Sequence, residues 1–224
     1  MSETPYYISL QEAINIAHKS PVRIEMEKVP LDEAHGRILA TDLSSKVNDP
    51  PFDNSAMDGF AVRFEDSNSA PTTLSVVATS QAAASEDSIS ISTGEAVQIM
   101  TGAPLPRGAD AIIPIEACTV DGDSVTLNQP SKPNFIRRCG ENIKKGVVGL
   151  KEGSYLSPQS ISMCATMGYD QIPVVKKLKI GIISTGDELK SPGETLSFGE
   201  IYESNSYGLS GLVKALGHSP IRYP

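Results

Sequence analysis

Two carboxylates lie among small residues in one stretch of this chain, directly after a pair of prolines. The stretch reads PPFDNSAMDGFAV over residues 50–62 and contains Asp53 and Asp58. Asp, Asn and Ser favour turns because their side chains bond nearby backbone, and Gly59 permits conformations closed to other residues. The apolar run 60–62 predicts a strand, so Asp58 lies where a rigid loop enters a strand. A single Asp-Gly pair would indicate only a well-capped turn, but the whole run indicates a ligand site.

A second cluster, QIMTGAPLPRGAD, covers residues 98–110. A predicted strand ends at Thr101, which can offer a hydroxyl group. Gly102 lets the backbone approach a ligand or another chain closely. The alternative for this cluster alone is a turn stiffened by its prolines.

A third cluster, FIRRCGENIKK over residues 135–145, concentrates basic side chains in an acidic protein. Arg137 and Arg138 could each bind phosphate oxygens through two hydrogen bonds. The alternative is a solvated strand, in which alternation would send only one of the two arginines inward. Both interpretations stay open from the sequence.

A fourth cluster, STGDEL over residues 184–189, follows the buried-strand pattern KIGII at 179–183. Ligands of open α/β sheets gather at the carboxyl ends of the strands. The amides of Thr185 and Gly186 could therefore bind an anion, and Glu188 could ligate a hard cation. An ordinary capped turn is the alternative.

The first cluster resembles the signature of the molybdopterin molybdenumtransferase family, which includes the C-terminal domain of gephyrin. The second cluster is similar to the substrate-contacting loop of that family. The fourth, together with GEIYESN at 199–205, resembles its pterin-binding α/β domain. The four clusters stand in the family's order and cover most of the chain, from about Ser9 to Gly217.

The resemblance implies insertion of molybdate into adenylylated molybdopterin with release of AMP, assisted by Mg²⁺. The acids Asp58 and Glu188 would then be the catalytic and metal-binding residues, since such a reaction needs carboxylates to position the metal against phosphate. The residues expected to contact the substrate are Thr101, Ser184, Thr185, Gly186, Asn205, Arg137 and Arg138. Asn205 would begin the helix that follows the ligand loop.

One position departs from the family pattern. Many members have an aspartate directly before Ile143, whereas this chain has Asn142, which keeps hydrogen bonding but loses the charge. The family also implies a homodimer in which the β-rich domain of one subunit faces the α/β domain of the other, and a molybdopterin-adenylylating enzyme as a partner. Two other functions stay open: a gephyrin-like scaffold without catalysis, and a nucleotide-handling protein sharing only the α/β portion. The proline-rich first motif counts against the latter.

Composition excludes several other classes of protein. The chain has 224 residues, 39% of them hydrophobic, and a net charge of -8. An extended basic face for nucleic acid or an anionic membrane is therefore not expected. The cysteines Cys118, Cys139 and Cys164 lack metal-ligand spacing and indicate free thiols. Without an apolar run of about 20 residues or a leader pattern, we expect a cytoplasmic protein.

The predicted fold is a multidomain α+β arrangement. Residues 1–46 and 143–177 would form an elongated linker domain with N-terminal helices, and 47–142 an inserted β-rich domain. Residues 178–224 would begin an α/β molybdopterin-binding domain that is incomplete, because a parallel strand pair needs further strands to bury both its faces. The chain is thus expected to be an N-terminal fragment, inactive alone.

Local patterns predict the elements of these domains. A capping box at Ser9–Glu12 begins a helix that ends near Ser20, and the chain is expected to stay mainly helical to about Ser45, with a second short helix at 31–35. Predicted strands cover 74–79, 96–101, 111–120 and 124–127, with a hairpin turn at 121–123 and a loop at 82–90. A helix follows Ser157, and the strand 179–183, a loop at 184–199 and a last helix open a βαβ unit.

Overall fold

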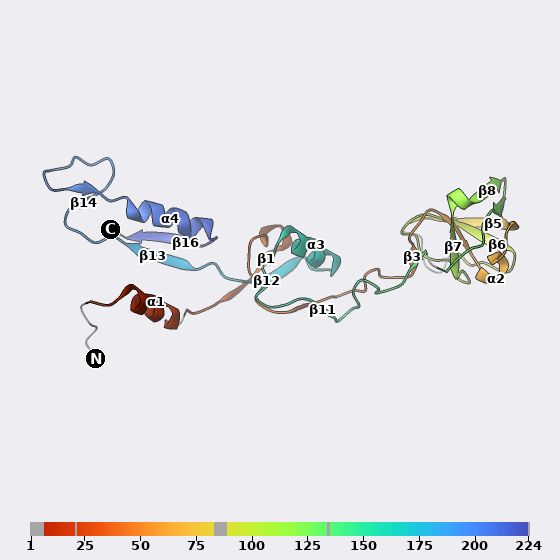
Figure 1. Ribbon diagram of the computed structural model, residues 1–224, viewed down its shortest axis with the longest axis horizontal. Helices are drawn as coiled ribbons and strands as arrows, with labels where there is room; N and C mark the ends of the chain where they lie inside the picture. The colour runs from red at the N-terminus through yellow and green to blue at the C-terminus, as the bar shows by residue number, and fades with distance from the viewer. Residues whose placement is uncertain (1–6, 21, 83–88, 134, 224) are drawn as a thin grey trace. The chain divides into compact units, whose positions relative to one another are not determined.

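The structure, a computed structural model, describes residues 7–20, 22–82, 89–133 and 135–223. The chain forms two compact units, each mixing helices and strands. Figure 1 labels most of these elements. The central unit comprises Asp42–Glu152 and Pro158–Asp170, and the terminal unit comprises Met1–Thr41, Gly153–Ser157 and Gln171–Pro224. The predicted mixture of helices and strands is confirmed, whereas the three-domain division stays a prediction.

A six-stranded sheet forms the body of the central unit, within the region predicted to be β-rich. In spatial order its strands are β7 (Ala111–Pro114), β4 (Gly59–Val62), β6 (Glu95–Ile99), β5 (Thr72–Ser80), β9 (Ser124–Leu127) and β8 (Cys118–Asp121). Neighbours run antiparallel except β5 and β6, which are parallel. The start of β4 therefore lies beside the end of β6, and this places the residues just outside both strands together.

Strand β4 is buried on both faces of the sheet. Phe60 and Val62 belong to one apolar cluster, and Ala61 belongs to another that also contains Ile99 and Ile112. Successive residues of a strand point to opposite faces, so burial of both faces requires an unbroken apolar run rather than alternation. This explains why the sequence after Gly59 is continuously apolar, and it fixes the position of the loop that precedes it.

The central unit has smaller elements around this sheet. They are β2 (Leu43–Ser44), paired with β11 (Val148–Leu150); β3 (Asn54–Ser55), paired with β10 (Ile136–Arg137); α2 (Phe64–Ser67); and α3 (Pro158–Thr166). The strand predicted over 111–120 is divided by a 3-10 turn at Ile115–Ala117, directly after Pro114. The hairpin turn at 121–123 is confirmed, with Asp121 opposite Ser124 and Gly122 at φ 56°.

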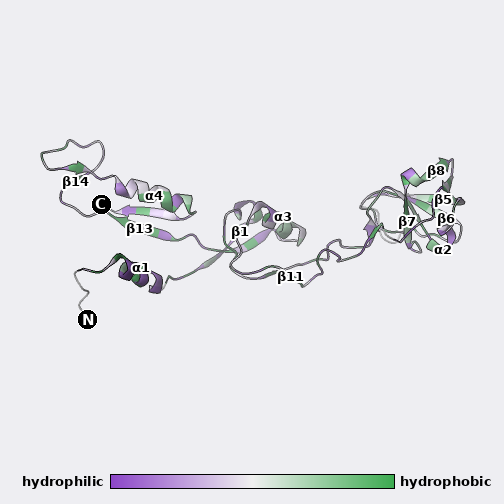
Figure 2. Ribbon diagram, in the orientation of Figure 1, coloured by the Kyte–Doolittle hydropathy of each residue, from purple (hydrophilic) through white to green (hydrophobic). Residues whose placement is uncertain are grey.

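The terminal unit begins with helix α1 (Leu10–Lys19). Its predicted capping box is confirmed, because Ser9 accepts from the N–H of Glu12 and the Glu12 carboxylate accepts from the N–H of Ser9. The helix ends before Ser20, as expected. Hydrophobic and hydrophilic residues both occur along it (Figure 2), yet none of its side chains is buried within the described structure.

The expectation of a mainly helical N-terminal region is wrong. Strand β1 (Met26–Pro30) pairs antiparallel with β12 (Gln171–Val175), and residues Leu31–Glu33 form only a 3-10 turn. The residues that pair with β1 lie 141 to 149 positions later in the sequence, so local helix patterns could not indicate the pairing. Tertiary pairing overrides weak local propensity here.

The predicted βαβ opening is confirmed. Strand β13 (Lys179–Ile183) runs parallel to β16 (Ser219–Tyr223), and α4 (Asn205–Ala215) connects them, beginning at Asn205 as expected (Figure 1). The predicted loop 184–199 is not wholly irregular, since β14 (Leu189–Lys190) pairs with β15 (Ile201–Tyr202).

Two remaining points concern the extent of the elements. The loop predicted at 82–90 falls largely on residues 83–88, which lie outside the described residues. Across the ranges that are described, the helices are too short and too polar to cross a bilayer.

Candidate functional site

The antiparallel pair β4 and β6 brings Asp58 and Thr101 together in the central unit. Gly59 lies opposite Ile99, so the residue before β4 meets the turn after β6. The Asp58 Oδ1 atom accepts hydrogen bonds from the N–H and the hydroxyl of Thr101, each at 2.7 Å. The two sequence clusters that contain Asp58 and Thr101 thus lie side by side in the fold.

Close backbone packing holds this place rigid. A Cβ atom at Gly59 would lie 2.0 Å from the carbonyl oxygen of Ile113, so only glycine fits between β4 and β7. The N–H of Gly102 donates to the carbonyl of Ser55, and the N–H of Ile115 donates to the carbonyl of Asp58. The carboxylate of Asp58 therefore extends from a backbone that is fixed on both sides.

The Asp58 carboxylate is exposed and charged at neutral pH. The hydroxyl of Thr101, followed by its N–H, lowers the pKa of Asp58 below the ordinary value. Both bonds go to Oδ1, and no described residue donates to Oδ2. An exposed carboxylate with one oxygen held and the other available suits a hard cation such as Mg²⁺, which prefers one or two carboxylates and substrate oxygens.

The two arginines of the third cluster bind different acids. Arg137 donates to Glu141 Oε1 at 2.8 Å and to Asn142 Oδ1 at 3.1 Å. Arg138 donates to Asp53 Oδ2 at 2.6 Å. Arg137 lies in β10 and Arg138 directly follows it, and alternation turns their side chains to opposite sides. The structure therefore does not bring the two guanidinium groups together on one anion, and their phosphate contacts stay predictions.

Asp53 links the first cluster to the third. Its Oδ1 accepts from the N–H of Cys139 at 2.8 Å, while Oδ2 accepts from Arg138. Burial raises the pKa of Asp53, but the N–H of Cys139 and the Arg138 guanidinium lower it by more, so the carboxyl stays ionised. Its role is to tie two loops of the central unit together, a role the sequence did not suggest.

Asn142 bridges a cation and an acid. Its Oδ1 accepts from Arg137, and its Nδ2 donates to Asp49 Oδ2 at 2.8 Å. The amide accepts and donates at once in this position, whereas a carboxylate would face Asp49 without a proton to share. The departure from the family pattern is thus matched by a neighbouring acid, Asp49, which the sequence analysis did not single out.

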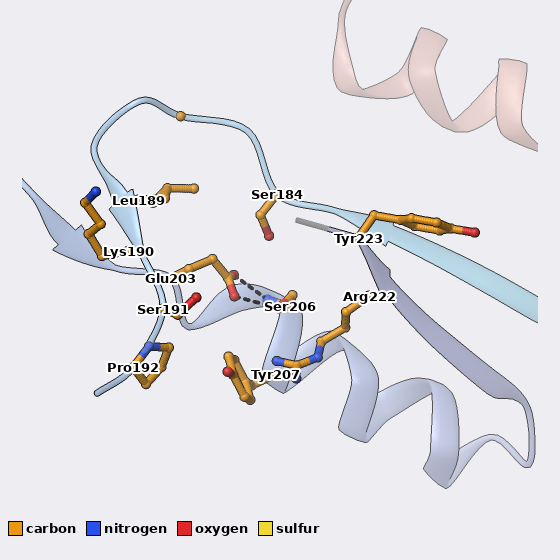
Figure 3. A pocket seen from close by; sticks show the side chains of 11 residues that line it. Ser184, Leu189, Lys190, Ser191, Pro192, Glu203, Ser206, Tyr207, Arg222 and Tyr223 are labelled. Carbon is orange, nitrogen blue, oxygen red and sulfur yellow. Dashed lines mark hydrogen bonds between the residues drawn. The ribbon is translucent and has the colours of Figure 1, made fainter. Parts of the chain in front are cut away.

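A pocket of about 360 Å³ lies at the carboxyl ends of β13 and β16 in the terminal unit (Figure 3). Two of the predicted substrate-binding residues, Ser184 and Gly186, line it. An adjoining hollow is lined by Ser184, Thr185 and Asn205. All four predicted contacts in this unit therefore gather around the end of β13, where the sequence placed them.

Glu203 is the acid of this pocket that the sequence analysis missed. It accepts from the N–H and the hydroxyl of Ser206, at 2.7 and 2.5 Å (Figure 3). The Ser206 hydroxyl, then its N–H, and to a smaller extent the Ser184 hydroxyl and the Arg222 charge lower the pKa of Glu203. An acid directly before a Ser-Asn helix start is the signal that could have identified it.

Glu188 folds back on its own loop. A Cβ atom at Gly186, where φ is 154°, would lie 2.7 to 2.8 Å from the Glu188 carboxylate oxygens. Because residue 186 is a glycine, the Glu188 carboxylate has room to lie against the backbone of this loop. Asp58 belongs to the central unit and Glu188 to the terminal unit. Among the described residues, no three His, Cys, Asp or Glu side chains converge as a metal cluster.

The three cysteines are free thiols that differ in environment. Burial, and secondarily the charge of Glu116, raises the pKa of Cys118 to about 11, and burial also raises the pKa of Cys164. Both are therefore poor nucleophiles at neutral pH. Cys139 is exposed, and its sulfur lies 3.2 Å from the carbonyl oxygen of Pro51. The N–H of the same cysteine donates to Asp53.

Comparison with known proteins identifies a family whose model covers most of the chain. The family model "MoeA N-terminal region (domain I and II)" matches residues 8–168. Molybdopterin molybdenumtransferase 2 of Mycobacterium tuberculosis is 42% identical over 193 residues, which is 84% of this chain and 48% of that protein. The molybdopterin molybdenumtransferase of Haemophilus influenzae is 42% identical over 200 residues, 88% of this chain and 48% of that protein.

Solved structures agree with this match. Two crystal structures of a molybdopterin biosynthesis MoeA protein from Pyrococcus horikoshii have TM-scores of 0.83 and 0.79, at 32% and 38% identity. They cover 96% and 89% of this chain, which in turn covers 56% and 54% of theirs. The chain spans about half the length of the curated relatives it matches.

Proposed function

This chain belongs to the MoeA family of molybdopterin molybdenumtransferases, and on that premise we propose that it takes part in inserting molybdate into adenylylated molybdopterin, with release of AMP. The observation that carries the proposal is the fixed, ionised carboxylate of Asp58, hydrogen-bonded twice to Thr101. Because the chain matches about half of its relatives' length, the complete reaction is proposed for the protein rather than for this segment.

The residues of the site would act by positioning. Asp58 would hold Mg²⁺ through its available oxygen in the central unit, and Glu188 would do so in the terminal unit. When bound, Mg²⁺ would neutralise charge on the phosphate of the leaving nucleotide. Thr101 keeps Asp58 ionised and fixes its direction, so the carboxylate needs little rearrangement when a ligand arrives.

The hollow around the end of β13 would hold the pterin side of the substrate. Ser184, Thr185 and Asn205 offer hydroxyl and amide groups of the kind that recognise a pterin ring through hydrogen bonds. Arg137 and Arg138 would add contacts to phosphate oxygens after exchanging their present acid partners. Substrate contacts from both units would be supplied in a homodimer, with a molybdopterin-adenylylating enzyme as the source of the substrate.

One observation favours a second function, that of a scaffold without catalysis. Helix α1 presents apolar side chains that nothing covers in the described structure, with Leu10 79% and Ile16 54% exposed. Exposed apolar surface of this kind suits a protein interaction site. A scaffold needs this surface but does not need an ionised Asp58.

Calorimetry with adenylylated molybdopterin and Mg²⁺ separates the two functions. We expect Asp58→Asn to weaken binding at least tenfold, about 1.4 kcal/mol. Asp121→Asn, which removes the same charge from the hairpin turn of the same unit, serves as the control and should bind like the parent chain. Equal affinity of the Asp58→Asn variant and the parent would contradict a role for this carboxylate, and absence of binding by the complete protein would favour the scaffold.

A further inference from the structure

A second hollow in the terminal unit, of about 320 Å³, lies between α4 and β16 and adjoins the pocket of Figure 3, with which it shares Tyr207 and Arg222. It is lined by Tyr207, Ser210, Gly211, Lys214, Pro220 and Arg222. None of the residues assigned above to substrate or metal lines it. We propose that this hollow, called here the Arg222 site, binds a phosphate-type oxyanion.

Charge is the first argument for an anion. No carboxylate oxygen in the described parts of the chain lies within 4.0 Å of the side-chain nitrogens of Arg222 or Lys214. The arginines at positions 37, 63, 137 and 138, in contrast, each pair with an acid. The charge of Arg222 also lowers the pKa of Glu203 in the neighbouring pocket, without an ion pair within that distance. In a chain with a net charge of -8, two cations that face one hollow with no acid within 4.0 Å favour an anionic ligand.

Geometry is the second argument. The guanidinium of Arg222 lies over the ring of Tyr207, 3.7 Å from its centroid, and Figure 3 shows the two side chains next to each other. Stacking on an aromatic ring holds the planar fork in one orientation and leaves its edge available. Such an edge binds two oxygens of a phosphate group with paired hydrogen bonds. Lys214, in the last turn of α4, offsets the partial negative charge of the helix end.

An unpartnered hydroxyl is the third and independent argument. The Ser210 Oγ atom is buried and has no hydrogen-bond partner in the described structure. Serines within helices commonly bond the carbonyl four residues earlier, and buried hydroxyls are nearly always satisfied. Ser210 lines the same hollow as both cations. The Oγ atom has almost no surface that solvent can reach, so a ligand oxygen in the hollow would become its partner once the Ser210 side chain turns toward it.

Two glycines of α4 provide a matched test. A Cβ atom at Gly211 or at Gly208 would meet nothing within 4 Å, so either position accepts a side chain without strain. Gly211 lines the hollow and Gly208 does not. Because glutamine favours a helix more than glycine does, Gly211→Gln should fill the hollow and Gly208→Gln should leave it open, with both variants folded.

The measurement is an NMR titration of the Arg222 Nε–Hε resonance with sodium phosphate, AMP and adenosine at constant ionic strength. We expect a saturable shift with phosphate, an apparent dissociation constant at least tenfold weaker in Gly211→Gln, and no change in Gly208→Gln. If AMP saturates the shift at a lower concentration than phosphate does, and adenosine causes no shift, the ligand is a nucleotide phosphate. If AMP and phosphate saturate the shift at equal concentrations, the ligand is a free oxyanion.

Either of two results would overturn the proposal: a shift that never saturates, or one that Gly211→Gln and Gly208→Gln affect equally. The outcome is independent of the transferase function, because Asp58→Asn lies in the other unit and should leave the Arg222 titration unchanged. Absence of adenylylated molybdopterin binding with an intact phosphate response would therefore refute the transferase function and leave the Arg222 site standing.

Discussion

At the scale of single residues, the pair of Asp58 and Thr101 makes a direct prediction about proton binding. In Thr101→Val the hydroxyl donor is lost, so the pKa of Asp58 should rise toward its ordinary value. A depressed folded-state pKa stabilises the fold above the unfolded pKa, and that stability is lost as the pH falls through the folded value. The variant should lose the part of this acid-range dependence that the hydroxyl supplies, and an NMR titration of the Asp58 carboxyl carbon would reveal the change.

The Thr101→Ser variant is the control for that experiment. It keeps a hydroxyl at the same position and should keep the low pKa of Asp58. An unchanged titration in Thr101→Val would mean that the backbone N–H of residue 101 alone holds the carboxylate.

The amide of Asn142 makes a second residue-scale prediction. Asn142→Asp removes the donor to Asp49 and places two carboxylates face to face, so the free energy of unfolding should fall by about 1 kcal/mol at neutral pH and low salt. Added salt should reduce the loss. The exchanged double variant, Asp49→Asn with Asn142→Asp, restores one amide and one acid and should recover stability in urea denaturation. A double variant less stable than either single one would refute the pairing.

At the scale of elements, the contact between β4 and β7 depends on one glycine. The added methyl of Gly59→Ala would lie 2.0 Å from the Ile113 carbonyl oxygen, which backbone movement alone can relieve. We expect a loss of about 3 kcal/mol or more in urea denaturation, at the upper end for overpacked sites. Gly122→Ala, in the β8–β9 turn with open space around it, should cost only about 1 kcal/mol for its positive φ. Similar losses of unfolding free energy in Gly59→Ala and Gly122→Ala would mean that the backbone around residue 59 moves to accept the methyl group.

The elements also show where sequence patterns succeed. The capping box, the hairpin turn at 121–123 and the start of α4 at Asn205 are local signals, and the structure confirms them. The region before Ser45 was mispredicted because β1 forms only through its distant partner β12. Local signals specify caps and turns, whereas strand pairing depends on contacts that a window of sequence does not contain.

At the scale of the whole molecule, two units with separate cores should unfold separately. Ile112 lies in the central unit and Leu39 in the terminal unit, and both are fully buried. Ile112→Ala should lower one calorimetric transition and Leu39→Ala the other, each variant losing about 2–5 kcal/mol. A single transition that both substitutions shift equally would contradict the division into two units.

The sequence by itself determined the family, the four clusters and the residue types at their centre. It did so because turn residues, glycines and carboxylates in fixed order are local and specific. Only the tertiary structure decided the partners: Thr101 beside Asp58, Asp49 beside Asn142, and Glu203 and Arg222 near the end of β13. These groups are far apart along the chain or hidden among ordinary side chains, and strand register, which depends on packing over the whole sheet, brings them together.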